Sequence, residues 1–79
     1  MTSTLDKAKI GSNCLIVKVT GEKPIKRRLM DMGLIPGTEI YVHKFAPLGD
    51  PLEIRVKNTE LTLRKADAKN IIIEAFAEE

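Results

Sequence analysis

Side chains that could take part in covalent chemistry are few in this chain of 79 residues. Nucleophilic catalysis needs a nucleophile, a base and usually a third group that orients the base. The single cysteine, Cys14, is followed by two apolar residues, and we expect it to be a small buried side chain. The single histidine, His43, falls in the middle of an expected strand, where a half-exposed structural position is the simpler interpretation. The sequence therefore favours a protein that is not an enzyme, with no catalytic residue and no cofactor.

A metal site would need several histidine, cysteine or carboxylate ligands that converge on one point. One cysteine and one histidine cannot make a structural zinc site. His43, Asp50 and Glu53 could approach one another, but their spacing does not require it. Phosphate-binding glycine motifs of the GxxxxGK[ST] and GxGxxG types do not occur. We therefore predict no metal ligand.

The densest positive patch is the triplet formed by Lys26, Arg27 and Arg28. On a helix successive side chains are about 100° apart, so the triplet spreads over about 200°. Lys26 and Arg27 should face solvent, whereas Arg28 lies nearer the apolar side of the helix. Met30 lies on the far side from that apolar stripe, where it could form an exposed apolar contact. Two interpretations stay open, a solvated helix face and a surface that docks on a partner.

These side chains must be positioned mainly by short strands, because apolar and polar residues alternate over much of the chain. The expected strands run over residues 14–20, 38–45, 52–57, 60–64 and 70–76. In the second of them, Ile40 and Val42 should share one face, opposite Tyr41, His43 and Phe45. A tight hairpin through Asn58-Thr59 should join the third and fourth strands.

One segment breaks this period of two and predicts a helix. Pro24 suits the first helical position, where its missing N–H has no cost. The apolar stripe of the helix consists of Ile25, Leu29 and Met32. Gly33 should end the helix in a left-handed conformation, and Pro36 prevents it from resuming. A second helical turn is expected at residues 65–69. We therefore predict a mainly β fold, a small antiparallel barrel of about five strands with one short helix inserted after the first strand.

Length and composition restrict the class of protein further. Residues 1–79 allow a single domain, and 43% of them are hydrophobic, which is ordinary for a globular core. The N-terminus has no apolar signal-peptide region and no run approaches the roughly 20 residues that cross a bilayer, so we expect a cytoplasmic protein. The net charge of +2 permits nucleic-acid binding without favouring it. Three aromatic residues are too few for base stacking or for a proline-peptide groove.

Three segments, in this order, resemble the FeoA family: RLMDMGLIPGTEI, APLGDPLEIRV and ELTLRKADAKNI. An L-x-x-x-x-x-G pattern from Leu5 to Gly11 precedes them, and the resemblance extends to Ile73. FeoA proteins are small SH3-like barrels associated with bacterial ferrous iron uptake. The resemblance therefore implies an SH3-like barrel that acts as a cytoplasmic accessory protein of the membrane transporter FeoB, whose cytosolic region carries a GTPase domain.

The resemblance also implies a function, namely binding the cytosolic region of FeoB and modulating its activity. We expect the helix and the neighbouring corners to form the docking surface, with the residues Lys26, Arg27, Met30, Leu34, Leu48 and Asp50. The family is also described under transition-metal binding, although no ligand cluster stands in the matched positions. The alternative is a free-standing SH3-like regulatory module that binds a metal-dependent repressor or another protein, or, less favoured, nucleic acid.

Overall fold

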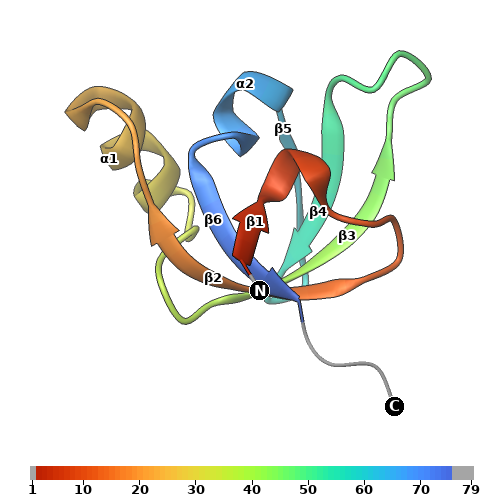
Figure 1. The fold of residues 1–79 in the computed structure, drawn as a ribbon, viewed down its shortest axis with the longest axis horizontal. Coiled ribbons are helices and arrows are strands. Elements are labelled where there is room, and N and C mark those ends of the chain that lie inside the picture. The colour runs from red at the N-terminus through yellow and green to blue at the C-terminus, as the bar shows by residue number, and fades with distance from the viewer. Residues whose placement is uncertain (1, 76–79) are drawn as a thin grey trace.

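The structure, a computed structural model, describes residues 2–75 (Figure 1). Its elements in chain order are β1 (Thr2–Thr4), the 3-10 helix η1 (Leu5–Lys7), β2 (Asn13–Val19), α1 (Lys23–Asp31), β3 (Glu39–Phe45), β4 (Leu52–Val56), β5 (Thr59–Leu63), α2 (Lys65–Ala68) and β6 (Ile71–Ala75). The mainly β class is confirmed, as is a helix inserted after the first long strand. The described part of the chain has six strands, because Thr2–Thr4 forms an additional short strand that we did not predict.

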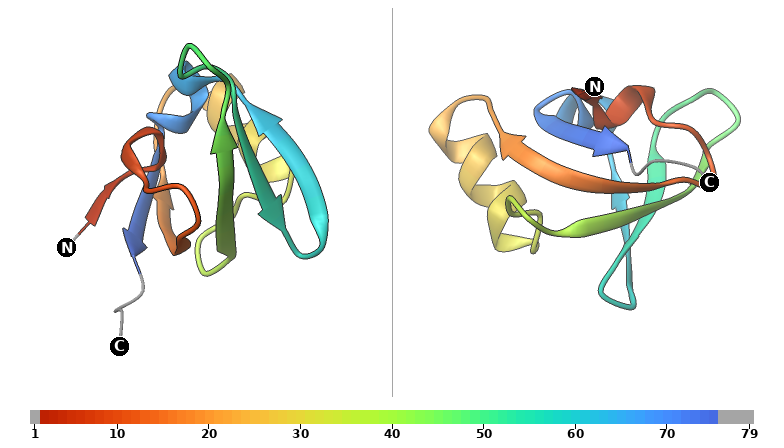
Figure 2. Two further views of the ribbon diagram at one scale, coloured as in Figure 1. Left: turned by 90° about the vertical axis from the view of Figure 1, so that its right-hand side faces the viewer. Right: turned by 60° about the horizontal axis from the view of Figure 1, so that its bottom comes forward.

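All six strands belong to one antiparallel sheet with the order β1-β6-β2-β3-β4-β5. The sheet is strongly curled, so that it wraps around its own concave face (Figures 1 and 2). The two edges, β1 and β5, do not pair with each other, so within residues 2–75 the sheet is barrel-like without closing through hydrogen bonds. The short helices η1 and α2 lie near each other at one end of this curl.

The core lies inside the curl and consists of aliphatic side chains from almost every element. Its buried members are Leu5, Cys14, Ile16, Val19, Leu29, Leu34, Ile40, Val42, Leu52, Ile54, Val56, Leu63, Ala68, Ile71 and Ile73. Two of them come from segments outside the expected strands and helices, namely Leu5 from η1 and Leu34 from the segment after α1, whereas Ala68 lies in α2, where a helical turn was expected. The core therefore joins the helices to the sheet without a disulfide, and Cys14 is buried as predicted.

Two β-bulges change which side chains of β2 and β3 face the core. The β2–β6 register shifts between Ile16 and Lys18, and as a result Val19 is buried whereas Val17 is 42% exposed. The β3–β4 register shifts between Val42 and Lys44, and Phe45 packs against the core on the same side as Val42. Our prediction that Phe45 lies opposite Val42 was therefore wrong, because a bulge inserts one residue and reverses the alternation.

The β4–β5 hairpin turns through two residues with positive φ, Lys57 at 50° and Asn58 at 69°. Val56 pairs with Thr59, so the loop has two residues, and two positive φ angles define a type I′ turn. The predicted hairpin is present, but its turn lies one residue earlier than the predicted Asn58-Thr59.

Helix α1 ends in a Schellman motif at Gly33, whose φ is 95°. The N–H of Gly33 donates to the carbonyl oxygen of Met30 (3.0 Å), and the N–H of Leu34 donates to that of Leu29 (3.2 Å). These two bonds satisfy carbonyl groups that a helix end leaves unpaired, and the motif brings an apolar residue after the glycine onto the last turn. The predicted end of the helix is confirmed, whereas its start is one residue earlier than predicted, which places Pro24 second.

Candidate interaction surfaces

The outward side of α1 carries a cluster of positive charge around one methionine. Lys23, Lys26, Arg27 and Met30 follow the i, i+3, i+4, i+7 spacing of one helix face, and together with Pro24 and Asp31 they line a shallow hollow. The three cations are exposed, and none of them has an ion-pair partner within residues 2–75. We call these four residues the α1 face.

Arg28 has a different role from the other cations of the helix. Its guanidinium Nη2 lies 2.8 Å from Oδ1 of Asp67, which is on α2 and is only 19% exposed. The ion pair therefore connects α1 with α2. This contact agrees with our expectation that Arg28 lies nearer the apolar side of the helix than Lys26 and Arg27.

The corner between β3 and β4 holds one leucine almost entirely in solvent. Leu48 is 96% exposed, in a turn closed by a bond from the N–H of Gly49 to the carbonyl oxygen of Ala46 (2.7 Å). Asp50 faces the protein, because its Oδ1 accepts a bond from the N–H of Lys65 (2.9 Å) at the start of α2. Asp50 thus fixes the corner to α2, and the corner presents Leu48.

The structure does not gather the six predicted docking residues into one patch. Lys26 and Arg27 are exposed, and Met30 is partly buried against the core. Leu34 is fully buried, so its side chain cannot contact a partner. It is the apolar residue that follows the glycine of the Schellman motif, and this pattern in the sequence already indicated a buried position. The corner with Leu48 lies at the opposite end of the molecule's long axis from α1 (Figure 1).

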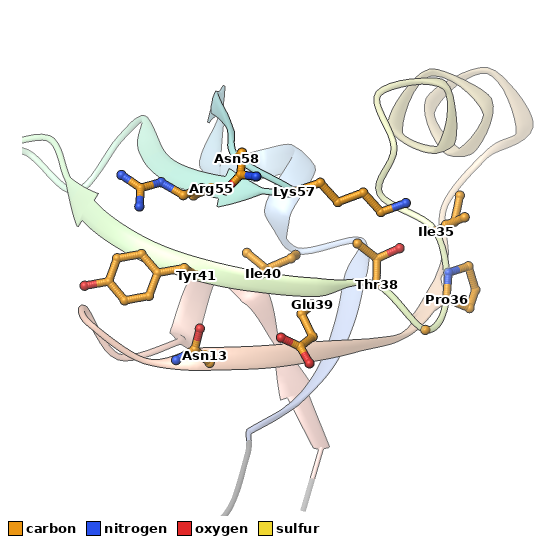
Figure 3. Close-up of a pocket in the computed structure, with 11 residues that line it drawn as sticks. Asn13, Ile35, Pro36, Thr38, Glu39, Ile40, Tyr41, Arg55, Lys57 and Asn58 are labelled. Atoms are coloured by element: carbon orange, nitrogen blue, oxygen red, sulfur yellow. The ribbon is translucent and has the colours of Figure 1, made fainter.

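A second hollow, which we did not predict, lies along β3. We call it the furrow, and its lining residues are Asn13, Ile35, Pro36, Gly37, Thr38, Glu39, Ile40, Tyr41, Arg55, Lys57 and Asn58. Figure 3 shows β3 as its floor, with the β4–β5 turn on one side, Asn13 of β2 on the other, and the segment from α1 to β3 at one end. Because three separate stretches of the chain contribute, no local sequence pattern could have revealed the furrow.

The furrow exposes both apolar and charged groups. Ile35 is 39% exposed at the end nearest α1, next to Pro36 (Figure 3). Arg55 and Lys57 lie on the β4 side, and Arg55 is also paired with Glu60 of β5, with Nη2 3.0 Å from Oε2. The hydrogen bond from Arg55 lowers the pKa of the Glu60 carboxyl, so the carboxylate keeps its charge to a lower pH than an unpaired glutamate would.

The described residues do not assemble a metal site. Within residues 2–75 no group of three or more histidine, cysteine, aspartate or glutamate side chains could hold a metal ion. The three candidates from the sequence have other neighbours: His43 lies beside the Tyr41 ring, Asp50 caps α2, and Glu53 is 3.9 Å from Lys44. The donor set therefore does not fit a bound iron or zinc ion.

Cys14 lacks the surroundings of a reactive thiol. Burial raises the pKa of the Cys14 thiol, an effect that a contact with the hydroxyl of Ser12, 3.8 Å from Sγ, only partly opposes. A thiol with a raised pKa stays protonated at neutral pH, and the protonated form is a poor nucleophile.

Comparison with known proteins matches the FeoA domain to residues 3–75. The chain belongs to the FeoA family. Over 73 residues it is 34% identical to a Fe(2+) transport protein A/Fe(2+) transporter FeoB fusion protein of Porphyromonas gingivalis. The match covers 92% of this chain but only 9% of that protein, so the chain corresponds to a small part of its length. The family is associated with ferrous iron transport, as the resemblance in the sequence implied.

Solved FeoA structures have the same fold. A FeoA-like protein of Clostridium acetobutylicum superposes with a TM-score of 0.91 at 37% identity, over 99% of this chain and 91% of that one. FeoA of Stenotrophomonas maltophilia, solved with zinc and described as an SH3 domain protein, gives a TM-score of 0.78 at 27% identity, over 90% and 88% of the two chains. The SH3-like class predicted for this chain is therefore confirmed.

A manganese-dependent transcriptional repressor also contains this fold, with a TM-score of 0.87 over 95% of this chain and 41% of the repressor. At 10% identity the likeness concerns the fold alone.

None of the helices described in residues 2–75 combines the length and the apolar character needed to cross a membrane.

Proposed function

We propose that this FeoA-family chain is a non-enzymatic accessory protein of ferrous iron uptake, which binds the cytosolic region of a FeoB transporter and modulates its activity in the cytoplasm. The observation that carries the proposal is the Porphyromonas gingivalis relative, whose name joins Fe(2+) transport protein A and FeoB in one polypeptide. Covalent fusion keeps two modules at a high effective concentration, which is advantageous when they act on each other. As separate chains, the two would need a direct binding surface.

The α1 face is the surface that we propose for this contact. Its three cations are free of ion pairs within residues 2–75, whereas Arg28 of the same helix is engaged with Asp67. The opposite side of α1 is fixed to the core by Leu29, so a partner can cover the outward side without disturbing the fold. An acidic surface on the partner would complement the α1 face and speed association.

Leu48 is a separate contact in this proposal. A leucine whose backbone is already held in a hydrogen-bonded turn loses little backbone freedom when a partner covers it, so less of the gain from burying its side chain is offset. Because α1 and this corner lie at opposite ends of the molecule, a partner that covers both must wrap around one side of it. Modulation further requires that the partner's conformational states bind this chain with different affinities.

An NMR titration of the amide signals with a cytosolic fragment of a FeoB transporter tests the proposal. We expect shifts that cluster on residues 23–31, with a second group at residues 46–50 if the corner takes part. Absence of shifts at high fragment concentration, with and without guanine nucleotide, would overturn the proposal.

Charge reversal on α1 provides the matched test. The double variant Lys26→Glu/Arg27→Glu should weaken binding at least about tenfold, which corresponds to about 1.4 kcal/mol. The control Lys7→Glu/Lys9→Glu makes the same change in charge on exposed residues away from α1 and should bind almost normally. If both variants lose affinity equally, only the net charge matters and the α1 face is not the docking surface.

A further inference from the structure

We propose that the furrow along β3 is a second binding site, which takes an extended acidic segment of a partner protein as an added strand. This site is separate from the α1 face, so the proposal stands whether or not α1 contacts a transporter. It rests on three features of the described residues: an unpaired stretch of strand backbone, two cations on one wall, and an exposed apolar end.

The backbone groups in question are the N–H and C=O of Glu39, a residue that lies opposite Leu15 in the β2–β3 register. Its neighbour Ile40 pairs with Cys14 of β2, and the carbonyl of Thr38 accepts a bond from the N–H of Ile16, also of β2. Peptide groups of alternate residues in a strand point to opposite neighbours. The N–H and C=O of Glu39 therefore point away from β2, toward β4.

On that side the strand β4 has already separated from β3. The β3–β4 pairing ends at Tyr41 and Arg55, and the next residues of β4 lead into the turn at Lys57. Both views of Figure 2 show the tip of the β4–β5 hairpin extending away from the segment that precedes β3. Among residues 2–75 no backbone hydrogen bond joins Glu39 to the turn. A wedge is left in which one donor and one acceptor of a strand face solvent, and an extended peptide is the ligand that satisfies both.

The charges around the wedge favour an acidic occupant. Lys57 and Arg55 lie on the β4 side and their side chains extend toward opposite ends of the furrow (Figure 3). The carboxylate of Glu39, which also lines the furrow, points toward Asn13 on the β2 side. Lys57 has no ion-pair partner within residues 2–75, and Arg55 shares its charge with the exposed Glu60. Because the two cationic groups lie toward different ends of the furrow, an extended segment with several carboxylates can place one near each of them.

The end of the furrow nearest α1 supplies an apolar contact. Ile35 and Pro36 are exposed there, and the Lys57 side chain extends toward them (Figure 3). An apolar side chain of the bound segment can pack on this pair while a neighbouring carboxylate meets the lysine. The predicted ligand is therefore an extended segment in which acidic residues alternate with aliphatic ones.

A capped eight-residue peptide of alternating valine and glutamate is the probe that tests this site, with alternating valine and lysine as its control. We expect the acidic peptide to bind the full chain at low salt with a dissociation constant of about 1 mM. The amide signals of residues 39–41 and 57–58 should shift, and exchange of the Glu39 amide hydrogen should slow as it becomes bonded. The lysine peptide should leave these signals unchanged.

Variants of Lys57 complete the test without disturbing the turn, because Asp and Asn tolerate positive φ. Lys57→Asp should weaken binding of the acidic peptide about tenfold and Lys57→Asn less, whereas Lys9→Asp, with the same change in charge elsewhere, should have little effect. Absence of shifts at several millimolar acidic peptide, equal binding of the lysine peptide, or unchanged affinity of the Lys57→Asp variant would each overturn the proposal. A short oligonucleotide that binds the furrow more tightly than the acidic peptide would also overturn it.

Discussion

The α1 face and the furrow both present positive charge to solvent, but they are supported in different ways. The α1 face comes from one short stretch of chain, and α1 is attached to the protein through Leu29, two partly buried apolar side chains, a Schellman motif and the Arg28–Asp67 pair. The furrow is assembled from three separate stretches of the chain, which are held by strand pairing between β2, β3, β4 and β5. One surface depends on a local attachment, and the other depends on the register of the whole sheet.

This difference predicts that the two surfaces can be damaged separately. Loss of the α1 attachment should displace the helix while the β2–β5 ladders persist, since strand pairing does not pass through α1. Loss of sheet register should abolish the furrow and the fold together. The two surfaces are connected by the segment from Gly33 to Thr38, which ends the helix and lines one end of the furrow.

Leucine truncation at that segment should have the largest effect. Leu34→Ala removes a fully buried side chain and leaves a cavity, so the free energy of unfolding should fall by about 3 kcal/mol. Leu48→Ala, the same change at a side chain that is 96% exposed, should alter it by less than about 0.5 kcal/mol. Urea unfolding followed by circular dichroism measures both. Equal losses for the two variants would mean that Leu34 does not anchor the end of α1.

Substitution of Gly33 should act on the α1 face more than on the furrow. Its φ of 95° lies in the left-handed region, where an alanine side chain is strained, so Gly33→Ala should cost about 1 kcal/mol. Gly33→Asn is the matched control and should cost less, because asparagine tolerates this region better. Amide signals of residues 23–34 should shift strongly in the alanine variant, while those of residues 52–63 stay in place. Equal shifts across the sheet would show that the two surfaces are not independent.

Much of the fold could be predicted because its signals are local. Pro24, Gly33 and the spacing of Ile25, Leu29 and Met32 sufficed to locate α1 to within one residue at its start. The long strands followed from alternation, and the resemblance to the FeoA family supplied their arrangement. The chain position of each element depends mainly on its own residues, which a sequence displays directly.

The errors occurred where neighbouring strands decide the outcome. A bulge depends on how two strands pair, so the inward position of Phe45 could not be obtained from its own strand alone. The strand Thr2–Thr4 is too short to show alternation and exists because it pairs with β6. The furrow depends on the separation of β4 from β3 beyond Arg55, which again is a property of the pair. Leu34 differs, because the glycine before it already indicated a buried position.

The smallest predicted effect concerns the wall of the furrow and depends on pH. The hydrogen bond from Arg55 is the main cause that lowers the Glu60 pKa, and the charges of Arg55, His43 and Lys44 add to it. A carboxyl with a lowered pKa in the folded state stabilises the fold above its unfolded pKa, and this contribution is lost as the pH falls through the folded value.

Arg55→Gln should therefore raise the Glu60 pKa toward its ordinary value, measured by carboxyl NMR during an acid titration. His43→Gln should raise it less, because His43 acts only through its charge. An unchanged Glu60 pKa in the Arg55→Gln variant would mean that Arg55 is not held by Glu60, and its full charge would then be available to an acidic segment in the furrow.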